Sequence, residues 1–220
     1  MAPPDHCDLP PFAPVPPDRV LSLAAGGDAE LRVQRSRFLA RVAPAADEAA
    51  AKTIIAETGR LHHDARHVCW AWRLGRAATP AEARSDGGEP AGTAGEPILA
   101  ALRKAGLVDC VGVVVRWFGG VKLGTGGLSR AYAEATVLAL ATAPRREILL
   151  GRRFSLRFGY QLQKSLLRDL AGRGGRIVEE EYGADVAWIV WLPHSAARAY
   201  AAEVTELSHG TVTPVPVAGD

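Results

Sequence analysis

The stretch best suited to chemistry is 119–127, in which five of the nine residues are glycine. Glycine loses more backbone freedom on folding than any other residue, so this density must be offset by a structural or functional gain. Glycine amides at the start of a helix direct several N–H donors and the positive end of the helix dipole toward one point. Such a point favours an anion, and phosphate is the first ligand class to consider.

Two explanations of these glycines stay open, namely anion or phosphodiester binding and close packing of helix and sheet backbone. The Walker motif fails because Thr125 replaces its lysine, and the dinucleotide fingerprint fails because Ser129 replaces its third glycine. A lysine adds a mobile charge, and arginines add planar guanidinium groups that fit phosphate. The predicted anion-binding or nucleic-acid-binding residues are Arg116, Gly119, Gly120, Lys122, Gly124, Thr125, Gly126, Gly127 and Arg130.

The charge around this stretch is locally basic. Residues 97–153 contain nine basic and three acidic residues, a net charge of +6, whereas the whole chain carries +2. A basic segment in a nearly neutral protein is typical of an RNA-binding surface, and it is also compatible with an ordinary solvated surface.

A second candidate is the polar, glycine-rich segment 85–95, which holds Asp86 and Glu89. Carboxylates at this spacing suit acid–base chemistry or a hard cation, but they also accept backbone hydrogen bonds in turns. We expect both, together with His67, to line the anion site. His62, His63, His67 and Cys69 lie close in sequence without a clear fourth ligand, so no metal site is predicted. Ser129 lacks the context of a serine nucleophile, and no catalytic residue and no cofactor are predicted.

Length and composition describe an ordinary globular protein of 220 residues with 48% hydrophobic residues. No apolar run approaches the roughly 18 residues that a membrane helix needs, and the first residues do not resemble a secretory signal. Three cysteines without a CxxC pair favour reduced thiols and a cytoplasmic location.

The predicted elements of the first half leave residues 85–95 and 119–127 on connections between strands and helices. Residues 1–17 hold seven prolines and predict an extended, mostly disordered tail. The next predicted elements are two short strands or a hairpin within 30–42, a helix from Asp47 to a stop at Gly59, and a strand over 68–74. A structureless connection over 75–95, a helix from Pro97 to a stop at Gly106, and a buried strand over 108–118 follow. The helix after the glycine stretch should bury Leu128, Ala131, Tyr132, Ala135, Leu138 and Ala139 and end before Pro144.

The second half predicts a different architecture, joined through a basic linker between Arg145 and Arg153. Its elements are a strand over 154–160, a helix over 162–170, strands over 177–182 and 185–192, a helix that includes Tyr200, Val204 and Leu207, and a closing strand within 211–217. This order is the βαββαβ pattern of a ferredoxin-like sandwich.

Three segments carry a family resemblance that covers about residues 20–217, namely Asp64–Cys69, Ser85–Gly95 and Val114–Tyr132. Together they resemble the YigZ/IMPACT family. The resemblance implies a two-domain α+β protein. Residues 18–146 would have the fold of the second domain of ribosomal protein S-five, and residues 150–218 would be a ferredoxin-like domain similar to the last domain of elongation factor G.

The resemblance also implies a function, that of a non-enzymatic regulator associated with translation, whose partner is RNA or a ribosome-associated protein. Two alternatives remain, a phosphate-substrate hydrolase or phosphotransferase that uses Asp86 or Glu89, and a protein-docking module. The chain departs from the family at Gly87, where an acid is usual, and at Glu96, where a basic residue is usual. The first departure argues against paired acids that bind a metal.

Overall fold

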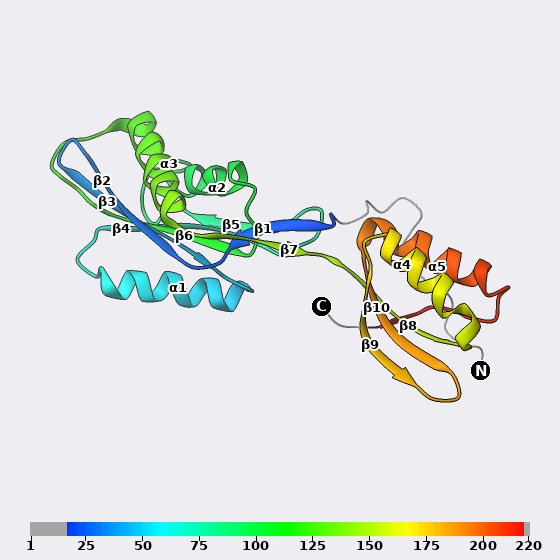
Figure 1. Cartoon of the computed structure of the whole chain (residues 1–220). Helices are drawn as coiled ribbons and strands as arrows, with labels where there is room; N and C mark the ends of the chain where they lie inside the picture. Colours follow the sequence, from blue (N-terminus) through cyan, green and yellow to red (C-terminus); the bar gives the residue numbers. More distant parts are fainter. Residues whose placement is uncertain (1–16, 218–220) are drawn as a thin grey trace, which may run out of the picture. The chain divides into compact units, whose positions relative to one another are not determined.

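A computed structural model describes residues 17–217, which divide into two compact units (Figure 1). Residues 20–148 form the N-terminal unit, and residues 149–217 form the C-terminal unit together with residues 17–19. The proline-rich tail predicted over 1–17 lies outside the described residues except for its last position. Within residues 17–217, no helix is long and apolar enough to cross a membrane.

The N-terminal unit is built on a five-stranded antiparallel sheet. In spatial order its strands are β2 (Gly27–Val33), β3 (Ser36–Pro44), β6 (Cys110–Trp117), β4 (His67–Leu74) and β5 (Ala81–Ser85). Helices α2 (Gly95–Lys104) and α3 (Gly124–Thr142) cover one face, and α1 (Glu48–Leu61) covers the other (Figure 1). Strand β6 is almost entirely buried because both of its faces are covered, which explains its continuous run of valines.

Two further strands lie outside this sheet. Strands β1 (Arg19–Leu23) and β7 (Arg145–Leu149) pair with each other as a separate two-stranded sheet. The sequence analysis missed both, because β1 is short and because the arginines of β7 were assigned to a linker.

Three other details of the N-terminal predictions are wrong. The connection over 75–95 is not structureless, because it contains the polar edge strand β5. Helix α1 runs past Gly59 to Leu61, with Asp47 as its N-cap as predicted. Leu138 is 40% exposed, and the buried face of α3 includes Thr136 and Leu140 in its place.

The C-terminal unit has the predicted βαββαβ order. Its elements are β8 (Gly151–Phe158), a 3-10 turn (Tyr160–Leu162), α4 (Gln163–Gly172), β9 (Arg176–Tyr182), β10 (Val186–Pro193), α5 (His194–Leu207) and β11 (Val215–Val217). The sheet order β11-β8-β10-β9, with antiparallel pairing throughout, is that of a ferredoxin-like sandwich. The expected two-domain α+β class is therefore confirmed.

Candidate functional site

A cavity of about 500 Å³ lies in the N-terminal unit. It is bounded by the residues beside the start of β4, the end of β6, the loop at 88–90 and the start of α3. Its volume falls within the range of about 300–1,000 Å³ that is typical of small-molecule sites. The lining combines cations (Arg66, Arg116, Lys122), apolar side chains (Phe118, Leu123, Leu128) and a single carboxylate, Glu89.

The start of α3 is open to solvent beside this cavity. Its first turn contains no acidic residue, and no side chain among residues 17–217 caps it. Gly124, Thr125 and Gly126 are exposed. A Cβ atom added at Gly120, Gly124 or Gly126 would meet nothing within 4 Å, so these glycines are not required by packing. Gly120 and Gly124 do have positive φ angles of 86° and 69°, which glycine adopts most easily.

Gly119 serves the opposite purpose. A Cβ atom added at Gly119 would lie 2.1 Å from the carbonyl carbon of Arg35. The amide of Gly119 donates a hydrogen bond to Ser36 Oγ at 3.3 Å. The two explanations of the glycine stretch therefore apply to different positions. Gly119 allows close backbone packing, whereas the helix start leaves its backbone accessible.

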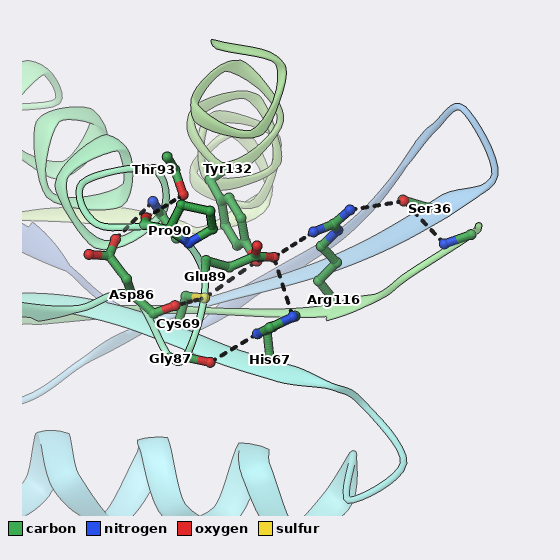
Figure 2. A network of polar contacts seen from close by, with 12 residues as sticks. Ser36, His67, Cys69, Asp86, Gly87, Glu89, Pro90, Thr93, Arg116 and Tyr132 are labelled. Carbon is green, nitrogen blue, oxygen red and sulfur yellow. Dashed lines mark hydrogen bonds and ion pairs between the residues drawn. The ribbon is translucent and has the colours of Figure 1, made fainter. Parts of the chain in front are cut away.

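Glu89 is a buried carboxylate with fixed partners, drawn in Figure 2. Its side chain is 3% exposed, and its Oε1 atom accepts hydrogen bonds from Arg116 Nη1 at 2.7 Å and from the Tyr132 hydroxyl at 2.8 Å. The Arg116 side chain is itself 5% exposed, and its Nη2 lies 3.4 Å from Ser36 Oγ. Within residues 17–217, Arg116 Nε is buried without a hydrogen-bond partner.

His67 faces the same carboxylate. Its Nδ1 lies 3.1 Å from the carbonyl oxygen of Gly87, and its Nε2 lies 3.9 Å from Oε1 of Glu89 (Figure 2). A carbonyl oxygen can only accept, so Nδ1 carries a hydrogen. The neutral imidazole therefore presents the lone pair of Nε2, and the protonated ring forms an ion pair with Glu89.

Asp86, three residues earlier, does not line the cavity. Its carboxylate accepts from the amides of Gly92, Ala94 and Gly95 at 2.9, 3.0 and 2.8 Å, so it holds together the turn that leads into α2. Burial alone would raise the pKa of Asp86, but these backbone hydrogen bonds outweigh burial and hold the pKa below its ordinary value. The arrangement is that of a structural cap.

Cys69 and Tyr132 link the main-chain carbonyl of Asp86 to the carboxylate of Glu89. The Cys69 thiol donates to the Asp86 carbonyl at 3.0 Å, and its sulfur lies 3.3 Å from the Tyr132 oxygen (Figure 2). Burial raises the pKa of Cys69 to about 12 and also raises the pKa of Tyr132, so both groups stay protonated at neutral pH. Tyr132 can then act as a steady donor to Glu89.

The structure brings together some of the predicted site residues and separates others. The predicted residues that line the cavity are His67, Glu89, Arg116, Lys122, Gly124 and Thr125. The predicted residues outside the lining are Asp86, Gly119, Gly120, Gly126, Gly127 and Arg130. Within residues 17–217, no group of three or more His, Cys, Asp or Glu side chains is placed to hold a metal ion.

Several residues of the site were not predicted. Arg66 and Phe118 line the cavity and lie within Asp64–Cys69 and Val114–Tyr132, so their place in the two segments that carry the family resemblance was an available signal. Tyr132 was assigned only to the apolar face of its helix. Its hydroxyl was a signal too, because a buried tyrosine usually finds a hydrogen-bond partner.

Fold and cavity together define a class, a two-domain α+β protein with an open, cation-lined cavity in its first unit and a ferredoxin-like second unit. Residues 34–140 match the Impact N-terminal domain, and residues 156–211 match a domain of unknown function, DUF1949. The chain belongs to the IMPACT family.

Individual relatives agree with this assignment. The chain is 34% identical over 181 residues to the IMPACT family member YigZ of Escherichia coli, across 82% of this chain and 89% of that protein. It is 32% identical over 184 residues to the IMPACT family member YvyE of Bacillus subtilis, across 84% of each chain. A crystal structure described as that of a hypothetical protein is 31% identical, with a TM-score of 0.62 over 92% of this chain and 99% of that chain.

Proposed function

We propose that this chain is a translation-associated regulator that binds a phosphate group of RNA in the cavity at the start of α3. Membership of the IMPACT family supports the first part of the proposal, because that family is of a translation-regulator type. The observation that carries the second part is the open start of α3, where exposed glycine amides adjoin the cavity with no acid in the first turn. A helix start of this kind stabilises an anion.

The surrounding charges favour the same ligand. Lys122 and Arg66 are exposed cations that line the cavity. Arg116 differs from them because its charge is compensated by Glu89 at 2.7 Å. Within residues 17–217, its Nε is a buried donor without a hydrogen-bond partner, which is a cost to the fold and not a contact that the cavity offers to a ligand.

A titration of the full chain with short single-stranded RNA tests this proposal. Lys122→Ala should weaken binding by about threefold to tenfold and reduce the slope of log affinity against log salt by about 0.7, because one phosphate contact is lost. Lys104→Ala is the matched control, since Lys104 is an exposed lysine of the same unit outside the cavity lining. RNA binding that is absent, indifferent to salt, or equally weakened by both substitutions would contradict the proposal.

One specific observation favours a second candidate function, phosphate-ester hydrolysis or phosphotransfer. His67 and Glu89 line the cavity together, and the neutral imidazole offers Nε2 as a proton acceptor. Asp86 drops out of this candidate because its oxygens already accept three backbone amides. Turnover in a panel of nucleotides, lost in Glu89→Gln, would support it, and no turnover across the panel would remove it.

A further inference from the structure

Glu89 is an unfavourable neighbour for an anion, although it lines the cavity as predicted. A carboxylate repels a phosphate. The ion pair with Arg116 compensates the charge of Glu89 and so reduces this repulsion, but it does not make the carboxylate attractive to an anion. An ionised carboxylate is also purely a hydrogen-bond acceptor. A cavity for phosphate alone gains nothing from such a group, whereas a ligand that carries both a phosphate and a hydrogen-bond donor does gain from it.

The geometry leaves one oxygen of Glu89 for this purpose. Arg116 and Tyr132 both donate to Oε1, and within residues 17–217 Oε2 receives no hydrogen bond. The two donors fix the carboxylate, and the surroundings are nearly closed, with side-chain exposures of 3% for Glu89 and 5% for Arg116. Among residues 17–217, Oε2 does not belong to the buried atoms that lack a hydrogen-bond partner, so solvent or a ligand can reach it, and a donor on the ligand would form a charge-assisted hydrogen bond there.

Phe118 supplies the third part of the site. It lines the cavity and is 43% exposed. The centroid of its ring lies 5.5 Å from the guanidinium carbon of Arg116. An exposed aromatic ring beside a cationic groove is the usual platform on which a base of single-stranded nucleic acid stacks. The cavity therefore combines a phosphate site, a hydrogen-bond acceptor and a stacking surface.

We infer that the cavity takes one ribonucleotide unit of single-stranded RNA, whose 2′-hydroxyl donates a hydrogen bond to Oε2 of Glu89. The phosphate lies at the start of α3 and Lys122, and the base lies against Phe118. This inference rests on the proposed function and adds selectivity for RNA over DNA to it, since the 2′-hydroxyl is the group by which proteins distinguish the two.

The deciding experiment changes the ligand and leaves the protein intact. The full chain is titrated at one salt concentration with a fluorescently labelled single-stranded RNA, with its 2′-fluoro analogue, which cannot donate, and with DNA of the same sequence. We expect RNA to bind about tenfold more tightly than either analogue, the effect of one hydrogen bond to a charged group. Equal binding of RNA and the 2′-fluoro analogue would overturn the inference and leave phosphate binding standing. No binding of any of the three would overturn both.

A protein variant sharpens the result. In Glu89→Gln, Arg116 and Tyr132 should hold the amide oxygen, so that the amide nitrogen, a donor, takes the place of Oε2. The preference for RNA over the 2′-fluoro analogue should then fall to about twofold or less. Glu134→Gln, which changes an exposed carboxylate of α3 outside the cavity lining, should keep the full preference. A full preference retained in Glu89→Gln would count against the inference.

A competition experiment tests whether the ribose phosphate in the cavity belongs to an RNA chain or to a free nucleotide. Large molar excesses of 5′-AMP should be needed to displace the labelled RNA, because a chain makes additional phosphate contacts along the basic surface. Displacement by roughly equimolar 5′-AMP would overturn the assignment to RNA.

Discussion

Two glycine-rich loops of the N-terminal unit lead into helices on the same face of the sheet, yet they end differently. In residues 86–95, which lead into the first residue of α2, Asp86 accepts hydrogen bonds from three backbone amides and closes the turn on itself. Residues 118–127 lead into and include the first turn of α3, where residues 124–126 are exposed and no side chain among residues 17–217 caps the helix. The comparison teaches that glycine content alone does not make a binding loop. What matters is whether the chain supplies its own acceptor for the amides.

Gly87 in the first loop and Gly124 and Gly126 in the second repeat this contrast, whereas Gly92 and Gly119 do not. In the first loop, a Cβ atom at Gly87 would lie 2.1 Å from the carbonyl oxygen of Val68, so the turn is packed against β4. In the second loop, a Cβ atom at Gly124 or Gly126 would meet nothing within 4 Å. The first loop is therefore expected to contribute mainly to stability, and the second mainly to binding.

The largest expected effect comes from opening the closed loop. Asp86→Ala should lower the free energy of unfolding by about 2–4 kcal/mol, because three amide hydrogen bonds to a charged acceptor are lost. Asp47→Ala, which removes a cap with one such bond, from Ala50 N at 2.8 Å, should cost about 1 kcal/mol. Urea unfolding measures both, and equal losses would show that Asp86 does not hold the loop together.

Acid should reproduce part of this loss. The folded-state pKa of Asp86 lies below its ordinary value, so its stabilising contribution is present above the unfolded pKa and disappears as pH falls through the folded pKa. We expect the wild type to lose more stability than Asp86→Asn between neutral pH and the acid range below the ordinary aspartate pKa. Unfolding midpoints measured across that range give the difference, and parallel curves for the two proteins would contradict the assignment.

Within the second loop, Gly119 should behave like Gly87 of the first loop, because both are packed against backbone. Gly119→Ala should destabilise by about 2 kcal/mol, because its methyl group meets the backbone at Arg35. Gly126→Ala should stabilise by about 0.5–1 kcal/mol, because alanine favours the helix and the space is open. Thermal unfolding distinguishes the pair. Destabilisation by both substitutions would mean that the start of α3 is more tightly packed than its surroundings show.

The smallest effect on stability should accompany a clear effect on binding. Thr125→Glu places an acid in the first turn of α3, which should stabilise the protein by about 0.5 kcal/mol through the helix dipole and weaken RNA binding. Leu138→Glu adds the same charge at a position that is 40% exposed and outside the cavity lining, and should leave RNA binding nearly unchanged. If both the stability and the RNA affinity rise in Thr125→Glu, the second loop does not serve mainly in binding, and the distinction between the two loops is wrong.

Most of the fold was predictable because it follows from local apolar patterns. The alternation at Phe154, Leu156 and Phe158 and the helical spacing of Leu166 and Leu170 all correspond to buried faces of the C-terminal unit. Strand β5 has no such pattern. Its Glu82 is held by Arg73 and Arg103, which lie 9 and 21 residues away, so its pairing depends on contacts that a local pattern does not contain.

The candidate site was predictable in its residue types and not in their roles. Asp86 and Glu89 were selected for the same reason, but Gly87 and Gly88 reverse the chain between them with φ angles of 55° and 86°. Asp86 therefore meets the amides before α2, while Glu89 meets Tyr132, 43 residues further along the chain. The spacing of two residues in the sequence does not predict roles that depend on the path of a turn and on a partner far along the chain.

The buried Cys69 thiol gives this unit an internal chemical reporter. The thiolate is the form of cysteine that attacks an alkylating reagent, and a fully buried thiol with a pKa of about 12 supplies almost no thiolate at neutral pH. Modification must therefore wait until the sheet separates from the loop above it. Under mild conditions, the rate at which iodoacetamide labels Cys69 measures how often this part of the protein opens, and ligands that hold it closed should slow that labelling.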